Sequence, residues 1–160
     1  MRVRLLLAGA AAALGFRALL ARAVLARLRA GVASLNEGDY APLLAGYAPD
    51  AVLRFNEGTH RWAGEHRGRD AIERFLQQFV AAGLQGEILE AAFAGAPWRM
   101  SLYVRFDDRA HGPGGELLYG NRTVLYARLR WGRIVLQEDF YEDTQRIVDF
   151  DARLSELAAG

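Results

Sequence analysis

Hydrophobic side chains recur along this chain with two different periods, and the change of period separates helices from strands. From residue 72 to residue 80 they fall three and four positions apart, the spacing of one buried helix face, at Ile72, Phe75, Leu76, Phe79 and Val80. From residue 98 to residue 107 apolar and polar residues instead alternate, as in a strand with one covered face. The sequence therefore predicts a mixture of helices and long strands.

The remaining elements follow from caps, turns and short apolar runs. Asp143 is placed to cap a last helix, and Gly83 ends the central one. We expect a long helix ending near Ser34, a short helix at 40–47, a strand at 51–55, a polar loop at 56–67, strands at 87–93 and 98–107, a hairpin at 119–141 and a helix at 144–157. Because no repeat or linker divides the chain, we expect one domain at 31–160 behind a basic, apolar helical extension at 1–30.

The hairpin has two candidate registers around its turn at residues 130–133. A two-residue loop would pair Asp139 with Val124, and a three-residue loop with a left-handed Gly132 would pair it with Thr123. A slip of one residue exchanges the faces of one arm. We expect the three-residue loop, which turns Asn121, Thr123, Leu125, Gln137, Asp139 and Tyr141 toward the inside of the sheet. Ile134, Leu136 and Phe140 would then lie on the outer face, where so much apolar surface predicts a homodimer.

Composition removes several kinds of chemistry. The chain has no cysteine, and all its 20 basic residues are arginine, so thiolate sites, disulfides and Schiff-base lysines are excluded. The three histidines lie in predicted loops without metal-ligand spacing, so we expect no metal and no cofactor. Beyond residue 36 the side chains sum to a mildly acidic charge, which gives no footprint for nucleic acid.

The first 36 residues are different, because they contain six arginines and no acidic residue. Their apolar run at 5–16 is too short to cross a bilayer, which needs about 20 residues. Three interpretations stay open: a signal peptide, a helix lying in a membrane surface, or a plain first helix running into the domain. We expect a cytoplasmic protein, with membrane contact through residues 1–30 under the second interpretation.

Several short motifs resemble the nuclear transport factor 2-like superfamily, and in particular its SnoaL-like branch. They are Asn36-Glu37-Gly38-Asp39, Tyr47-Ala48-Pro49-Asp50-Ala51-Val52, Gly68-Arg69-Asp70-Ala71-Ile72 and Tyr141-Glu142-Asp143-Thr144. The resemblance covers about residues 30–157. It implies an α+β fold in which a cone-shaped, curved antiparallel sheet wraps over three to four helices. It also implies a pocket for an apolar small molecule, of the kind that cyclases, isomerases and hydrolases of this superfamily use.

The ketosteroid isomerases of that superfamily provide one test of the chemistry. Their general base would fall at Phe55, their oxyanion-hole tyrosine near Gly31 and their oxyanion aspartate near Leu125. None of these side chains has the required group. The resemblance therefore does not extend to ketosteroid isomerase activity.

The limonene epoxide hydrolases provide a better match. Their Arg-x-Asp pair falls at Arg105 and Asp107, and their last-strand aspartate falls at Asp139, which would act as the base. Asn56 takes the place of a supporting asparagine, and Trp62 is a candidate for shaping the pocket. The alternation of the strand leaves a second interpretation open, because it also places Arg105 and Asp107 on a solvated face.

A rival of another class is a non-catalytic binding or dimerisation module whose cavity is filled by side chains. Cavity volume distinguishes the two, since ligand pockets measure roughly 300 Å³ or more.

Overall fold

The computed structural model describes residues 2–159, with side-chain surroundings from Leu14 onward. The described chain forms four helices and six strands. In order they are α1 (Arg2–Asn36), α2 (Ala41–Leu44), β1 (Tyr47–Phe55), β2 (Gly64–Arg67), α3 (Arg69–Ala81), β3 (Gln85–Ala96), β4 (Arg99–His111), β5 (Leu117–Arg130), β6 (Arg133–Tyr141) and α4 (Thr144–Ala159). This is the expected α+β fold.

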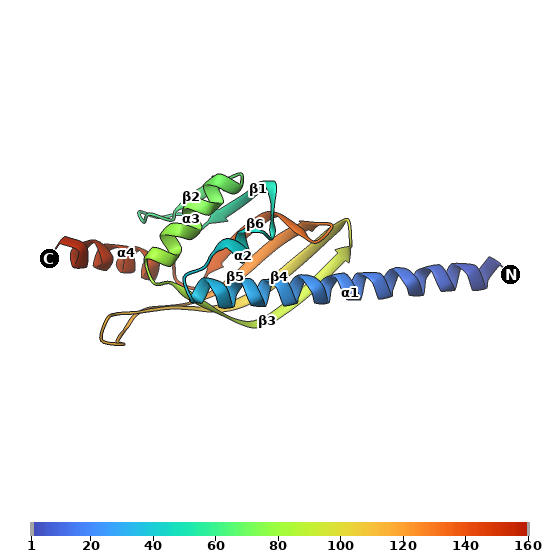
Figure 1. Cartoon of the computed structure of the whole chain (residues 1–160), viewed down its shortest axis with the longest axis horizontal. Helices are drawn as coiled ribbons and strands as arrows, with labels where there is room; N and C mark the ends of the chain where they lie inside the picture. The colour runs from blue at the N-terminus through green and yellow to red at the C-terminus, as the bar shows by residue number, and fades with distance from the viewer. Residues whose placement is uncertain (1, 160) are drawn as a thin grey trace.

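The six strands form one curved, open sheet in the order β2-β1-β6-β5-β4-β3, with helices lying across it (Figure 1). Every neighbouring pair is antiparallel except β1 and β6, which run parallel. The sheet is therefore mixed, where the sequence predicted an antiparallel one. The segment that contains the four-residue strand β2 was predicted to be a loop. The prediction missed this strand because its alternation is short and it contains no large apolar residue.

The core lies between the sheet and two helices. From α3, the side chains of Ile72, Phe75, Leu76 and Phe79 are buried, which confirms the helix face predicted from periodicity. From α1, Val24, Leu28, Val32 and Leu35 are buried at the same three- and four-residue spacing. Packing of α1 thus begins upstream of residue 30, and its N-terminal part continues past the end of the sheet (Figure 1).

The register of the β5–β6 hairpin differs from the prediction. Arg130 pairs with Arg133, so the loop has two residues, Trp131 and Gly132, rather than three. An irregularity then shifts the register between Arg128 and Leu129, and beyond it Asp139 pairs with Leu125 instead of Thr123. A two-residue loop alone would turn the side chains of β6 to the opposite face of the sheet from the one predicted. The extra residue in β6 cancels this change, so that Asp139 still points inward.

The faces of the hairpin therefore largely match the prediction although the turn does not. Thr123 and Leu125 of β5 face inward and are buried. Ile134 lies before the irregularity, opposite the buried Leu129, and is itself 6% exposed. Ile134 belongs to the core, so its expected place on the outer face was wrong. Phe140 is 58% exposed, in agreement with its expected place on that face.

Within the described residues, none of the helices combines the length and the apolar character needed to cross a membrane.

Candidate active site

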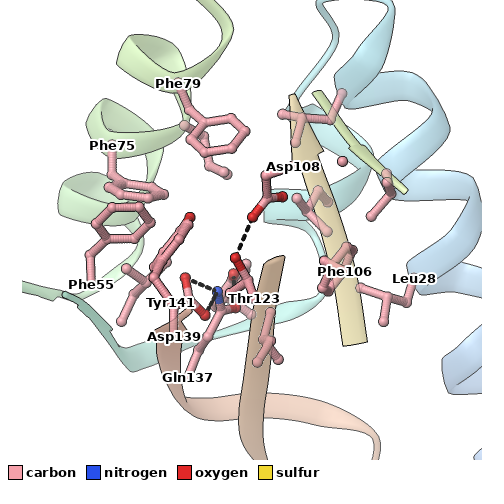
Figure 2. A pocket seen from close by; sticks show the side chains of 18 residues that line it. Leu28, Phe55, Phe75, Phe79, Phe106, Asp108, Thr123, Gln137, Asp139 and Tyr141 are labelled. Atoms are coloured by element: carbon pink, nitrogen blue, oxygen red, sulfur yellow. Dashed lines mark hydrogen bonds between the residues drawn. The ribbon is translucent and has the colours of Figure 1, made fainter. Parts of the chain in front are cut away.

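A cavity lies between the concave face of the sheet and the helices α1 and α3. Its walls are mainly apolar, with Leu28, Phe55, Phe75, Phe79 and Phe106 among them (Figure 2). Its polar side chains come from four strands and are Tyr47, Asp108, Thr123, Gln137, Asp139 and Tyr141. The cavity volume is about 80 Å³. This is well below the roughly 300 Å³ of ordinary ligand pockets, so by the volume criterion the cavity has room only for a small molecule or a few waters.

Asp139 reaches the cavity from β6 and is held by one neighbouring side chain. The Nε2 atom of Gln137 donates to both of its carboxylate oxygens, at 3.0 Å and 3.1 Å (Figure 2). The hydroxyl of Tyr47 on β1 donates to the Oε1 atom of Gln137. Because residues two apart on a strand share a face, Gln137 and Asp139 are fixed together by the fold of β6.

A second carboxyl group, Asp108, enters the same cavity from β4. It is 8% exposed, and the hydroxyl of Thr123 on β5 donates to it (Figure 2). The sequence prediction missed this residue because it ended the strand at Asp107. The pattern that found Met100, Leu102, Val104 and Phe106 on one face reaches Asp108 if it is continued by one step.

Both carboxyl groups have raised pKa values. Burial is the main cause for Asp139, and the nearby Asp108 adds to it, so that its pKa rises to about 7 despite the hydrogen bond from Gln137. Burial also raises the pKa of Asp108 to about 6, against the effect of hydrogen bonds from Thr123 and Tyr141. Removal from water disfavours a carboxylate, and a like charge nearby disfavours it further.

The expected Asp-Arg-Asp set is not assembled. Asp139 is in the cavity, but Arg105 and Asp107 alternate with the inward Phe106 and Asp108 and lie on the other face of β4. Arg105 is exposed there. The solvated-face interpretation thus fits Arg105, whereas Asp107 is half-buried on the same face. Asp139 has a second aspartate, Asp108, in place of an arginine.

The expected pocket-lining residues are divided between the cavity and other places. Those that line it are Thr123, Leu125, Gln137 and Tyr141. Asn121 faces inward but is used structurally, since its Nδ2 atom donates to the carbonyl of Asp143 at 2.7 Å, next to the start of α4. Its expected role in lining the pocket was wrong.

Trp62 and Asn56 were also wrongly expected to line the pocket. Trp62 is fully buried, and its ring stacks on Phe150 of α4 with centroids 6.1 Å apart. Neither it nor Asn56, whose amide atoms are closed off from solvent, is among the cavity residues. The loop around Trp62 packs against α4, where Arg61 also forms an ion pair with Asp151.

Between residues 2 and 159, no group of three or more histidine, aspartate or glutamate side chains is placed to hold a metal ion.

Comparisons with known proteins agree with this architecture. The profile of a family described as the SnoaL-like domain matches residues 28–137. No curated protein matches the chain. Among solved structures, Bal32a from a soil-derived mobile gene cassette is 21% identical with a TM-score of 0.66, and the alignment covers 82% of this chain and 98% of Bal32a.

Two further solved structures are similar to a comparable degree. TerC, co-crystallised with polyporic acid, is 20% identical with a TM-score of 0.64, over 81% of this chain and 98% of TerC. An NTF2-like protein of unknown function from Burkholderia pseudomallei is 20% identical with a TM-score of 0.63, over 80% of this chain and 96% of its own. At these identities the likeness concerns the fold, because one scaffold of this kind has many unrelated functions.

Proposed function

The chain belongs to the SnoaL-like domain family, and we propose that its cavity is the active site of an enzyme that moves a proton on a small, uncharged organic substrate. The observation that carries this proposal is the pair Asp108 and Asp139 in one apolar cavity, with pKa values of about 6 and about 7. Such a pair holds one proton near neutral pH, so that one carboxyl group accepts a proton while the other donates one.

The order of the two pKa values suggests the roles. Asp108, the stronger acid, is ionised first and acts as the base that removes a proton from a carbon next to a carbonyl group, the role that was expected of Asp139. The electrons of that C–H bond form the carbon–carbon double bond of an enol, while the carbonyl oxygen takes the proton of Asp139. Where the enol is conjugated with a second double bond, return of the proton from Asp108 to the far carbon gives an isomer, and the enol oxygen gives its proton back to Asp139. Attack by the enol carbon on a second carbonyl group of the same molecule gives a ring. In that step the carbon–oxygen π bond breaks, its oxygen takes the proton from Asp108, and the enol oxygen returns its proton to Asp139. The reaction class is therefore isomerisation or cyclisation by acid–base catalysis.

The walls of the cavity define the kind of substrate. Phenylalanine side chains from β1, β4 and α3 favour an apolar molecule. Among the described residues that line the cavity there is no arginine, which an anionic substrate would need as a partner. At about 80 Å³ the space suits a molecule of a few heavy atoms. A larger substrate requires Phe75 and Phe79 on α3 to move away from the sheet. The similar structure of TerC with polyporic acid supports an organic small molecule as the ligand.

The same small volume favours a second candidate function. In a non-catalytic binding or dimerisation module, the side chains would fill the cavity and the carboxyl pair would only lower stability. The two candidates differ in one measurable respect, since only the enzyme accelerates proton exchange on a carbon acid.

Deuterium incorporation into acetone in heavy water, followed by NMR, tests the proposal with a ketone small enough for the cavity. We expect the wild-type protein to accelerate deuterium incorporation next to the carbonyl group. The changes Asp108→Asn and Asp139→Asn should each slow it by about 10²–10⁴. Glu138→Gln is the matched control, because it removes a carboxyl group one position away from Asp139 on the other face of β6. Wild-type exchange no faster than in buffer would favour the non-catalytic module, and exchange that survives both cavity substitutions would contradict the assigned roles.

A further inference from the structure

Two exposed tryptophans lie at one end of the sheet, beside the helix that projects from it. Trp98 is in the turn between β3 and β4, Trp131 is in the turn between β5 and β6, and each is 61% exposed. Their ring centroids are 6.3 Å apart. Leu14, Phe16 and Arg17 of α1 line the same surface groove. We call this surface, made of Leu14, Phe16, Arg17, Trp98 and Trp131, the tryptophan edge.

The helix is fixed to this edge by direct hydrogen bonds. The Nε atom of Arg17 donates to the carbonyl of Gly95 at 2.8 Å, and its Nη2 atom donates to the carbonyl of Phe93 at 3.0 Å. These bonds satisfy backbone acceptors near the β3–β4 turn and place α1 against it. The exposed apolar residues of the helix and of the turns therefore form one continuous surface.

Trp131 occupies this place at a cost in backbone energy. Its φ angle is 53°, the only positive value at a non-glycine residue in the part of the chain that is described. The left-handed region suits Gly or Asn and is unfavourable for a bulky residue. A tryptophan held there with its ring mostly in solvent contributes little to the core, so its side chain is best explained by a contact outside the fold.

The charge around the edge is predominantly positive. Residues 1–36 contain six arginines and no carboxylate, and Arg99, Arg130 and Arg133 lie next to the two turns in the sequence. One acidic residue, Asp50, offsets this group, at 3.6 Å from Arg130. The edge thus combines aromatic and aliphatic side chains with a surplus of guanidinium groups.

We propose that the tryptophan edge binds the surface of a membrane that contains anionic phospholipids. Tryptophan is favoured at the boundary between lipid headgroups and acyl chains, since its ring is apolar and its N–H is polar. Arginine pairs with lipid phosphate, and each basic residue near an anionic surface adds to binding. Helix α1 would lie along the membrane rather than cross it.

The charges argue against a second copy of this chain as the occupant. Two tryptophan edges facing each other would bring many arginines together with only Asp50 of each copy to offset them, and like charges in an interface oppose association.

Co-sedimentation with lipid vesicles tests the proposal on the full-length chain. We expect binding to vesicles of phosphatidylcholine with 30% phosphatidylglycerol, weaker binding to pure phosphatidylcholine, and a loss of binding as sodium chloride is raised. The double variant Trp98→Ala/Trp131→Asn should bind about tenfold more weakly or worse. Asn is chosen at 131 because it tolerates a positive φ, so circular dichroism should show an intact fold.

The matched control is Leu117→Ala/Leu157→Ala. These leucines are 62% and 61% exposed, as exposed as the two tryptophans, but belong to β5 and α4 rather than to the edge. Binding of this control should equal that of the wild type. The proposal is overturned if the wild type stays in the supernatant with anionic vesicles, or if both double variants bind alike. A doubling of mass in solution that the tryptophan variant abolishes would instead assign the edge to a second copy.

Discussion

Both carboxylate oxygens of Asp139 accept their hydrogen bonds from a single donor, the Nε2 atom of Gln137, at 3.0 Å and 3.1 Å. One neutral amide replaces little of the water that a carboxylate loses on burial, so the charged form is disfavoured and the pKa rises. The fold therefore tolerates Asp139 more easily when it is protonated. Ionisation of the Asp139 carboxyl group therefore affects both the stability of the fold and the proposed proton transfer.

Stability should fall as pH rises through the range in which Asp139 ionises. Its pKa in the folded chain, about 7, lies above its usual value of 3.8, so the protonated form favours the native state. The contribution is fully present below about pH 4 and is lost as pH approaches 7, a change of about 4 kcal/mol at most. Asp139→Asn should therefore stabilise the fold at pH 8 and have little effect near pH 4. Urea unfolding at both pH values measures this, and an equal effect at both would contradict it.

Tyr47, Gln137 and Asp139 should behave as one coupled unit. Gln137→Leu leaves the buried Tyr47 hydroxyl and the Asp139 carboxyl group without their partner, which should cost about 1–3 kcal/mol. Tyr47→Phe alone removes a group together with its need for a partner and should cost about 1 kcal/mol. The double variant should lose less than the sum, by about 0.5 kcal/mol or more, because the two changes remove one shared bond. Strict additivity in urea unfolding would show that no coupling exists.

The fold was readable from the sequence where many residues repeat one pattern. The helix face of α3 is set by apolar residues that recur over two turns, and the tertiary structure does not override so consistent a repeat. The inward side of the hairpin was also predicted, with Thr123, Gln137 and Asp139 among its residues. Burial of one face specifies which residues point inward, even when the turn and the register are assigned incorrectly.

The features that the sequence prediction missed each depend on one residue rather than on a repeated pattern. The irregularity in β6 changes one residue's pairing, and nothing in the composition near Val135 marks it. Asp108 was lost because the end of a strand is uncertain by a few residues, and one residue decided between the outer Asp107 and the inner Asp108. Trp62 was misplaced because its partner Phe150 is 88 positions away in the chain and invisible to local patterns.

Substitution of Trp131 should change the stability of the fold and its membrane binding in opposite directions. Trp131→Asn places a residue that tolerates a positive φ before Gly132, in the Asn-Gly order that two-residue hairpin loops prefer. We expect thermal unfolding to shift upward by an amount equivalent to about 1 kcal/mol, while binding to anionic vesicles falls. Trp131→Phe retains an aromatic ring and the strain, so it should leave stability nearly unchanged. A variant with Asn that is less stable than the wild type would contradict the assigned strain.

We also expect the outer face of the sheet to join two copies of the chain. Tyr103, Val124 and Phe140 are 47%, 45% and 58% exposed on that face, and their apolar surface favours a symmetric contact. Phe140→Glu should halve the mass measured by light scattering during gel filtration, whereas Phe140→Leu should leave it unchanged. A wild-type chain that has the mass of one copy at all concentrations would contradict this expectation.

The most direct measurement of the central claim is the titration of the two cavity carboxyl groups by carbon-13 NMR with labelled aspartate. We predict two resonances that titrate near pH 6 and pH 7, one lost in Asp108→Asn and the other in Asp139→Asn. Asp108→Asn should also lower the pKa of Asp139, because a like charge has been taken away. If both groups instead titrate near the ordinary aspartate value of about 4, they are solvated, and the proposed acid–base pair does not exist.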